Sequence, residues 1–152
     1  MNRTMKRTWI AALALALAAL GTGCTHTTLA APKGFARMDG SYDFRATNPK
    51  GVVVAARTHG NDPQASLGFW AEAVDLKLES KGYKRIADKD VKSTGGVPGK
   101  LLQYDMGSGY RYWVAVFASD RHVVVTEATG YKDDVEPIAA DLEHSMASVQ
   151  ID

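Results

Sequence analysis

The sequence is poor in cysteine, with Cys24 as the only one among 152 residues. A single thiol excludes an internal disulfide, so we expect the folded domain to depend on its hydrophobic core. The four histidines are scattered and share no local spacing with this cysteine that is typical of a zinc site. We therefore predict neither a bound metal nor a cofactor.

An excess of basic charge is also absent. The formal net charge is +1, and three of the basic residues, Arg3, Lys6 and Arg7, lie at the N-terminus. Without these three, 15 Lys and Arg residues stand against 17 Asp and Glu residues, a net charge of −2. Nucleic-acid binding needs a basic patch or stripe, so we expect no nucleic-acid partner.

Motifs of enzymatic chemistry are missing as well. Gly107-Ser108-Gly109 is a tight hairpin between strands, whereas a nucleophilic serine of the hydrolase type sits on a strand-to-helix turn. No glycine-rich loop is followed by the Lys-Ser/Thr pair of a phosphate site. We predict no catalytic residues, and an envelope hydrolase is the last of three functional hypotheses.

The longest apolar run covers the 12 residues from Trp9 to Leu20 and follows the positive charges of the N-terminus. It fits the ~7–15 residues of a signal-peptide core and is shorter than the ~20 needed to cross a bilayer. We interpret residues 1–23 as a signal peptide. A buried N-terminal helix is the alternative, but the run has no amphipathic period.

The segment that follows, Leu20-Gly21-Thr22-Gly23-Cys24, resembles the lipobox of bacterial lipoproteins. The lipobox usually has Leu three residues before the cysteine, where this chain has Gly21. The resemblance implies cleavage before Cys24 and a diacylglyceryl thioether on its sulfur. This lipid anchors the chain in a membrane, and residues 24–34 form the tether between the anchor and the domain. Thr25 implies an outer-membrane location facing the periplasm. The alternative is ordinary secretion with cleavage near Ala30 and loss of Cys24.

The chain after the tether is organised around two apolar strands, Tyr110–Ser119 and His122–Ala128. Pairing Ser119 with His122 places Val114 opposite Glu127. Apolar residues then fill both sides of the hairpin, which predicts a central position in a sheet that is covered on both faces.

Other segments extend this sheet. Residues 41–59 predict a hairpin, and residues 83–91 and 100–106 predict two more strands. Helices are predicted from an Asp62-Pro63 start to Gly82, with Trp70 as a core anchor, and from Asp133 to Val149. Residues 35–152 therefore form an α+β domain, with an antiparallel sheet of about six strands flanked by two helices.

This order resembles bacterial PsbP-like domains. The resemblance is carried by five features of the sequence: the helix with Leu67, Phe69 and Trp70 and its Lys81-Gly82-Tyr83 exit; Gly96-Val97-Pro98-Gly99; Tyr110-Arg111-Tyr112; Val124-Val125-Thr126-Glu127-Ala128; and the amphipathic C-terminal helix. It implies an α/β/α sandwich and a non-catalytic binding or assembly module.

One carboxylate is out of place in this pattern. Glu127 lies on the same side of the hairpin as Val123 and Val125, where it needs a partner such as Tyr112 or Arg45. We consider two roles for it, a structural hydrogen-bond acceptor or a ligand contact in a cleft lined by Tyr104 and Tyr112.

Two functional hypotheses remain besides the hydrolase. The first is a lipid-anchored, non-enzymatic module of the bacterial cell envelope that contacts an unidentified protein. The alternative is a periplasmic lipoprotein that binds a small molecule or ion through the tyrosine-lined cleft. A protein-binding role predicts an exposed patch, whereas a ligand role predicts a concave pocket with convergent polar groups.

Overall fold

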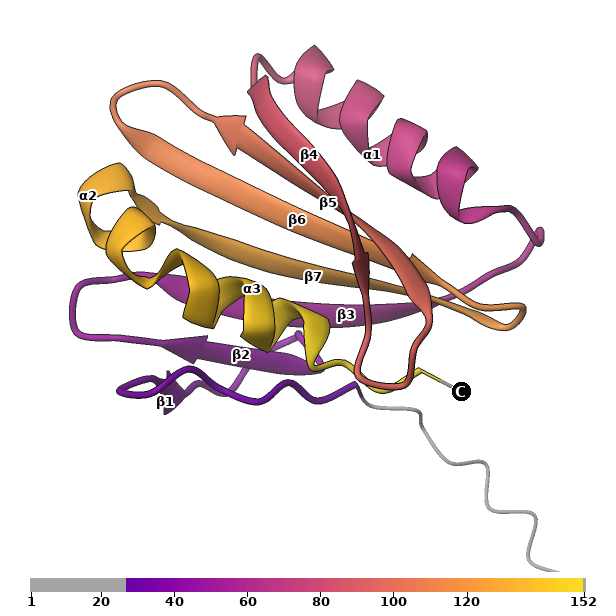
Figure 1. Ribbon diagram of the computed structural model, residues 1–152, viewed down its shortest axis with the longest axis horizontal. Coiled ribbons are helices and arrows are strands. Elements are labelled where there is room, and N and C mark those ends of the chain that lie inside the picture. Colours follow the sequence, from indigo (N-terminus) through magenta and orange to yellow (C-terminus); the bar gives the residue numbers. More distant parts are fainter. Residues whose placement is uncertain (1–26, 152) are drawn as a thin grey trace, which may run out of the picture.

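The computed structural model describes residues 27–151, which form one antiparallel sheet with helices on its two sides (Figure 1). The seven strands lie in the order β1-β2-β3-β7-β6-β5-β4. Their bounds are β1 Ala36–Arg37, β2 Phe44–Thr47, β3 Val53–Gly60, β4 Lys84–Lys92, β5 Pro98–Asp105, β6 Tyr110–Ala118 and β7 His122–Tyr131.

The helices cover opposite sides of different strands. α1 (Leu67–Ser80) packs on β4, β5 and β6. The C-terminal segment consists of α2 (Lys132–Val135), a 3-10 turn η1 (Glu136–Ile138) and α3 (Ala139–Ala147), and α3 packs on β3 and β7. Figure 1 shows the two helices displaced toward opposite edges of the sheet. Each side of the sheet is therefore covered by a helix over only part of its width.

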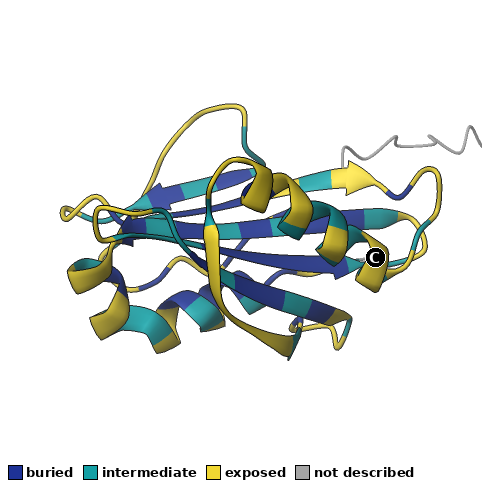
Figure 2. Ribbon diagram, turned by 90° about the horizontal axis from the view of Figure 1, so that it is seen from above, coloured by how far each residue is buried: buried dark blue, intermediate teal, exposed yellow. Residues whose placement is uncertain are grey.

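The central hairpin has the predicted register. Val114 pairs with Glu127 and Phe117 pairs with Val124, and β7 is the middle strand of the sheet. Buried residues lie on both sides of β6 and β7, and the strands in the middle of Figure 2 show dark blue segments alternating with teal ones. The apolar character of both faces thus gives the hairpin its central place.

The two sides of the sheet carry separate apolar clusters. On the α3 side, buried residues include Phe44, Trp113, Phe117, Leu142 and Met146. On the α1 side, the cluster is smaller and consists of Leu78, Leu102, Tyr104, Val114, Val116 and Val123. The α3 side is therefore the main core of the domain.

The strand count exceeds the predicted one by β1, which has only two residues. Ala36 and Arg37 pair with Thr47 and Ala46 of β2. Two exposed residues cannot show an alternating pattern, so the sequence gives no sign of this strand.

The predicted start of α1 is wrong. The helix begins at Leu67, and the side chain of Ser66 accepts a hydrogen bond from the Phe69 N–H. The segment before the helix is held by Asn61 and not by the predicted cap Asp62. The Asn61 side chain donates to the C=O groups of Ala65 and Ser119. It accepts from the backbone N–H of Ala65 and the indole N–H of Trp70. Trp70 is only partly buried in the smaller cluster, so it is a weaker anchor than predicted.

The end of α1 follows the sequence, whereas the single helix predicted from Asp133 to Val149 is divided into α2, η1 and α3, and α3 ends at Ala147. α1 ends before Gly82, whose φ of 86° needs a residue without a Cβ, and the Tyr83 N–H donates to the Leu78 C=O at 3.1 Å. Pro137 falls in η1, where its missing N–H interrupts the α-helical pattern between α2 and α3. Within residues 27–151, no helix is both long and apolar enough to cross a membrane.

Candidate functional site

Tyr104 ties β5 to the overlying helix. Its ring is fully buried, and its hydroxyl donates to Oδ1 of Asp75 on α1 at 2.8 Å. Oδ2 of the same carboxylate pairs with Arg85 of β4 at 2.9 Å. Burial, followed by the nearby Asp75 carboxylate, raises the pKa of Tyr104. These three residues connect β5, α1 and β4 through one hydrogen bond and one ion pair, which is a structural role.

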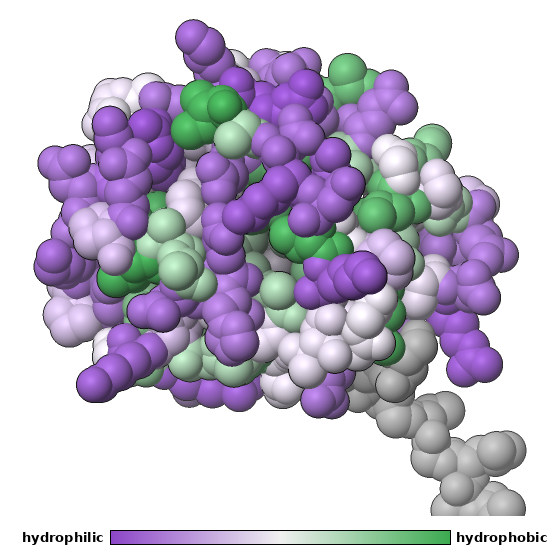
Figure 3. Space-filling view, in the orientation of Figure 1, coloured by the Kyte–Doolittle hydropathy of each residue, from purple (hydrophilic) through white to green (hydrophobic). Residues whose placement is uncertain are grey.

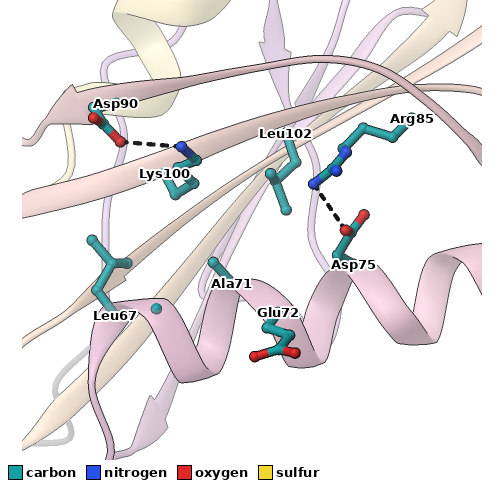
Figure 4. A pocket seen from close by; sticks show the side chains of 9 residues that line it. Leu67, Ala71, Glu72, Asp75, Arg85, Asp90, Lys100 and Leu102 are labelled. Carbon is teal, nitrogen blue, oxygen red and sulfur yellow. Dashed lines mark hydrogen bonds and ion pairs between the residues drawn. The ribbon is translucent and has the colours of Figure 1, made fainter.

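A cleft of about 400 Å³ lies beside these three residues, between α1 and strands β4 and β5 (Figure 4). Lys100 on its sheet wall pairs with Asp88 at 2.9 Å and Asp90 at 3.3 Å, and the lysine lowers the pKa of the Asp88 carboxyl. Figure 4 shows apolar side chains, such as Leu102, between the Asp90–Lys100 pair and the Asp75–Arg85 pair. The lining residues are Leu67, Gly68, Ala71, Glu72, Asp75, Arg85, Asp90, Lys100 and Leu102.

Tyr112 and Glu127 form a second pair, on the same side of the sheet but nearer its centre. The Tyr112 hydroxyl donates a short hydrogen bond to Oε1 of Glu127, and the Tyr83 ring lies 5.7 Å from the Tyr112 ring. Burial, followed by the negative charge of Glu127, raises the pKa of Tyr112, and Tyr83 and Tyr42 act in the same direction. The pair thus keeps a neutral phenol beside a carboxylate.

Beyond Glu127, no helix of residues 27–151 covers the α1 side of the sheet. Ala55 and Arg57 of β3 pair with Glu127 and Val125, and Arg45 of β2 pairs with Ala55, so all of them share this side. Arg57 is exposed, and Arg45 is partly exposed. Because α1 is displaced toward β4, Arg57 of β3 is open to solvent and Arg45 of β2 is partly so, whereas Ala55 between them is buried.

Both arginines make cation–π contacts with the ring of Tyr42. The Arg57 guanidinium lies 3.8 Å from the centre of the Tyr42 ring, and the Arg45 guanidinium lies 5.6 Å from it. Among residues 27–151, neither arginine is within ion-pair distance of a carboxylate, although six other basic residues form ion pairs. We call the set Tyr42, Arg45, Arg57, Tyr83, Tyr112 and Glu127 the tyrosine–arginine surface.

The predicted site residues share one side of the sheet but do not line one cleft. Tyr104 and Tyr112 are cross-strand partners, yet their hydroxyls bond to different carboxylates, Asp75 and Glu127. Neither tyrosine lines the 400 Å³ cleft. Glu127 takes Tyr112 as its partner, whereas Arg45, the other predicted partner, lies over Tyr42. Cys24 lies outside the described residues.

Sequence reasoning missed Tyr42, Arg57 and Tyr83. The strand pattern could have identified Arg57, because it lies two residues after Ala55 and therefore on the same side of β3. That side is the one that carries Glu127 in the sheet. Tyr42 and Tyr83 lie just outside regular strands, where no period assigns a side. Within the same described range, no group of three or more His, Cys, Asp or Glu residues is arranged to hold a metal ion.

Comparison with known proteins relates the chain to others by fold alone. No protein-family model matches the sequence, and no curated protein is detectably similar to it. Cyanobacterial PsbP (CyanoP) from Synechocystis has a similar solution structure, with a TM-score of 0.58 and 8% identity, over 84% of this chain and 87% of CyanoP. A Pseudomonas aeruginosa protein of unknown function, PA94, described as a putative regulator, matches with a TM-score of 0.52 and 14% identity, over 84% of this chain and 98% of PA94. The chain therefore has a PsbP-like fold.

Proposed function

We propose that this protein is a lipid-anchored, non-enzymatic binding or assembly module of the bacterial cell envelope. Acyl chains on Cys24 hold the domain at a membrane, in our proposal the outer membrane, with the domain facing the periplasm. Two or more acyl chains suffice for stable anchoring, since each buried methylene contributes ~0.8 kcal/mol. The lipobox-like segment supports the anchor, and the PsbP-like fold supports a domain that binds rather than catalyses.

The tyrosine–arginine surface is the contact site for a protein partner in this proposal. The observation that carries it is the pair Arg45 and Arg57, held against Tyr42 on an uncovered part of the sheet without a carboxylate partner among residues 27–151. Tyrosine and arginine are enriched at protein interfaces, and a prepositioned guanidinium loses little entropy on binding. The surface therefore fits a partner that presents acidic side chains.

Affinity capture from crosslinked membranes of the native host tests this function. We expect the wild type to recover a partner that Arg45→Glu/Arg57→Glu loses by at least about tenfold, because reversing both charges repels an acidic contact. Lys33→Glu/Lys92→Glu is the matched control, since it changes the net charge equally at two exposed residues outside the surface.

The same capture experiment is repeated with Cys24→Ala. We expect this variant to leave the membrane fraction and to recover less partner. Equal recovery by wild type and Arg45→Glu/Arg57→Glu would contradict the proposed surface. Retention of Cys24→Ala in the membrane would contradict the proposed anchor.

The alternative function, binding of a small molecule or ion in the periplasm, is favoured by a different observation. The cleft under α1 combines apolar walls with charged residues at its sides, the usual composition of a ligand pocket. Its position beside Tyr104 leaves the tyrosine–arginine surface free. A small-molecule binder of this kind would show no partner that depends on Arg45 and Arg57, so the capture experiment separates the two functions.

A further inference from the structure

α1 carries apolar side chains on two opposite faces. Its inner face, with Leu67, Trp70, Val74 and Leu78, packs on the sheet. On the outer face, Phe69 is 56% exposed and Leu76 is 59% exposed. Figure 3 shows hydrophobic side chains among hydrophilic ones at the upper right, over the position of α1 in Figure 1. The fold of residues 27–151 therefore leaves both side chains more than half exposed, although the Phe69 ring also lies 5.3 Å from the Trp70 ring.

The outer residues form one stripe along the helix. At about 100° per residue, Phe69, Ala73 and Leu76 fall within about 60° of one another, roughly opposite the inner face. Ala73 lies between the two large side chains and allows the backbone of a second helix to approach closely. The spacing of four and then three residues is that of the contact seam between two packed helices.

Charged residues flank this stripe asymmetrically. Glu72 and Glu79 lie on one side of it, and Lys77 lies on the other. All three are exposed, and none forms an ion pair with another residue in the described part of the chain. The stripe and its flanks thus define a surface with opposite charges at its two margins.

We propose that this face of α1 binds the same face of α1 in a second copy of the chain, with the two helices parallel. A two-fold axis along the helices places the acidic flank of each copy against the basic flank of the other. Glu72 then lies near Lys77 of the partner helix, five residues along, as in parallel coiled coils. An antiparallel pair would place like flanks together, with the glutamates of one copy facing those of the other, and like charges repel.

This inference goes beyond the proposed function, because it uses a different surface and a different partner. The full chain, expressed with its own N-terminal segment and solubilised in detergent, is measured by sedimentation equilibrium. We expect a reversible dimer that Leu76→Lys weakens at least about tenfold. Met38→Lys is the control, since Met38 is also an exposed apolar residue, 38% exposed, but lies next to β1.

Charge exchange tests the orientation. Glu72→Lys and Lys77→Glu are each expected to weaken the dimer, and the double variant is expected to restore it. A wild type that stays monomeric at all concentrations, or a dimer insensitive to Leu76→Lys, would overturn the proposal. Strengthening of the dimer by Glu72→Lys would also overturn it, because only like flanks in contact would produce that result.

A disulfide gives a direct reading of the helix direction. Ser80 is exposed at the end of α1, one heptad after Ala73, so in the parallel pair it lies close to Ser80 of the second copy. We expect Ser80→Cys to form a covalent dimer on mild oxidation, in excess of any that wild type forms through Cys24. Reversible dimers without this crosslink would rule out the parallel arrangement.

Discussion

A Gly99→Val variant is expected to have a free energy of unfolding about 3 kcal/mol lower than that of wild type. Gly99 lies in β5 opposite Phe117, whose ring is fully buried in the main core. A Cβ at position 99 would lie 2.4 Å from Cδ1 of Phe117 and 3.0 Å from the C=O of Val116. The Phe117 ring is fully buried, so accommodating the new side chain requires movement of the core.

Denaturant unfolding measures this effect, with Gly60→Val as the matched control. Gly60 also lies in a strand, β3, but a Cβ there would meet no atom within 4 Å. We expect the control to change the free energy of unfolding by much less than Gly99→Val. Equal stability of the two variants would mean that Phe117 does not occupy the position described.

The second large effect is a loss of stability in alkaline solution. The pKa values of Tyr104 and Tyr112 are both raised, by burial and by the carboxylates of Asp75 and Glu127. The unfolded chain therefore releases these two protons first, beginning near the ordinary tyrosine pKa of about 10. Stability is fully present below that pH and falls as pH rises toward the pKa values of the folded protein.

The expected slope is at most about 1.4 kcal/mol per pH unit for each tyrosine. Denaturant melts between pH 9 and pH 12 measure it. Tyr104→Phe and Tyr112→Phe should each flatten the decline, because each removes one proton from the difference between the two states. The exposed Tyr131 provides the control variant, Tyr131→Phe, which should keep the wild-type slope. A slope unchanged in all three variants would contradict the described environments of Tyr104 and Tyr112.

The sheet could be predicted from the sequence where side chains alternate strongly. The register of Val114 with Glu127 and of Tyr104 with Tyr112 follows from short turns and two-sided apolar strands. β1 could not be predicted, because pairing of two exposed residues depends on the neighbouring strand. The start of α1 was predicted too early, because Asp62-Pro63 is a typical pattern for a helix start. In the structure, the Asn61 side chain instead bonds the backbone N–H and C=O of Ala65 before the helix begins.

The candidate site was predictable only in part. Alternation correctly assigned Tyr104, Tyr112 and Glu127 to one side of the sheet. It could not show that α1 covers Tyr104 but leaves Arg57 exposed, because the lateral position of a helix depends on packing between distant segments. The contact between Arg57 and Tyr42 likewise joins a strand to a residue outside regular structure.

The central claim is that a PsbP-like domain is held at a membrane by an acylated Cys24. Intact-mass spectrometry of the protein purified from membranes of a bacterial host tests it most directly. We predict a chain that begins at Cys24 and carries a diacylglyceryl group on that residue, and we predict that Cys24→Ala yields no acylated species. A membrane-associated or secreted chain that begins elsewhere and carries no fatty acid would contradict the claim.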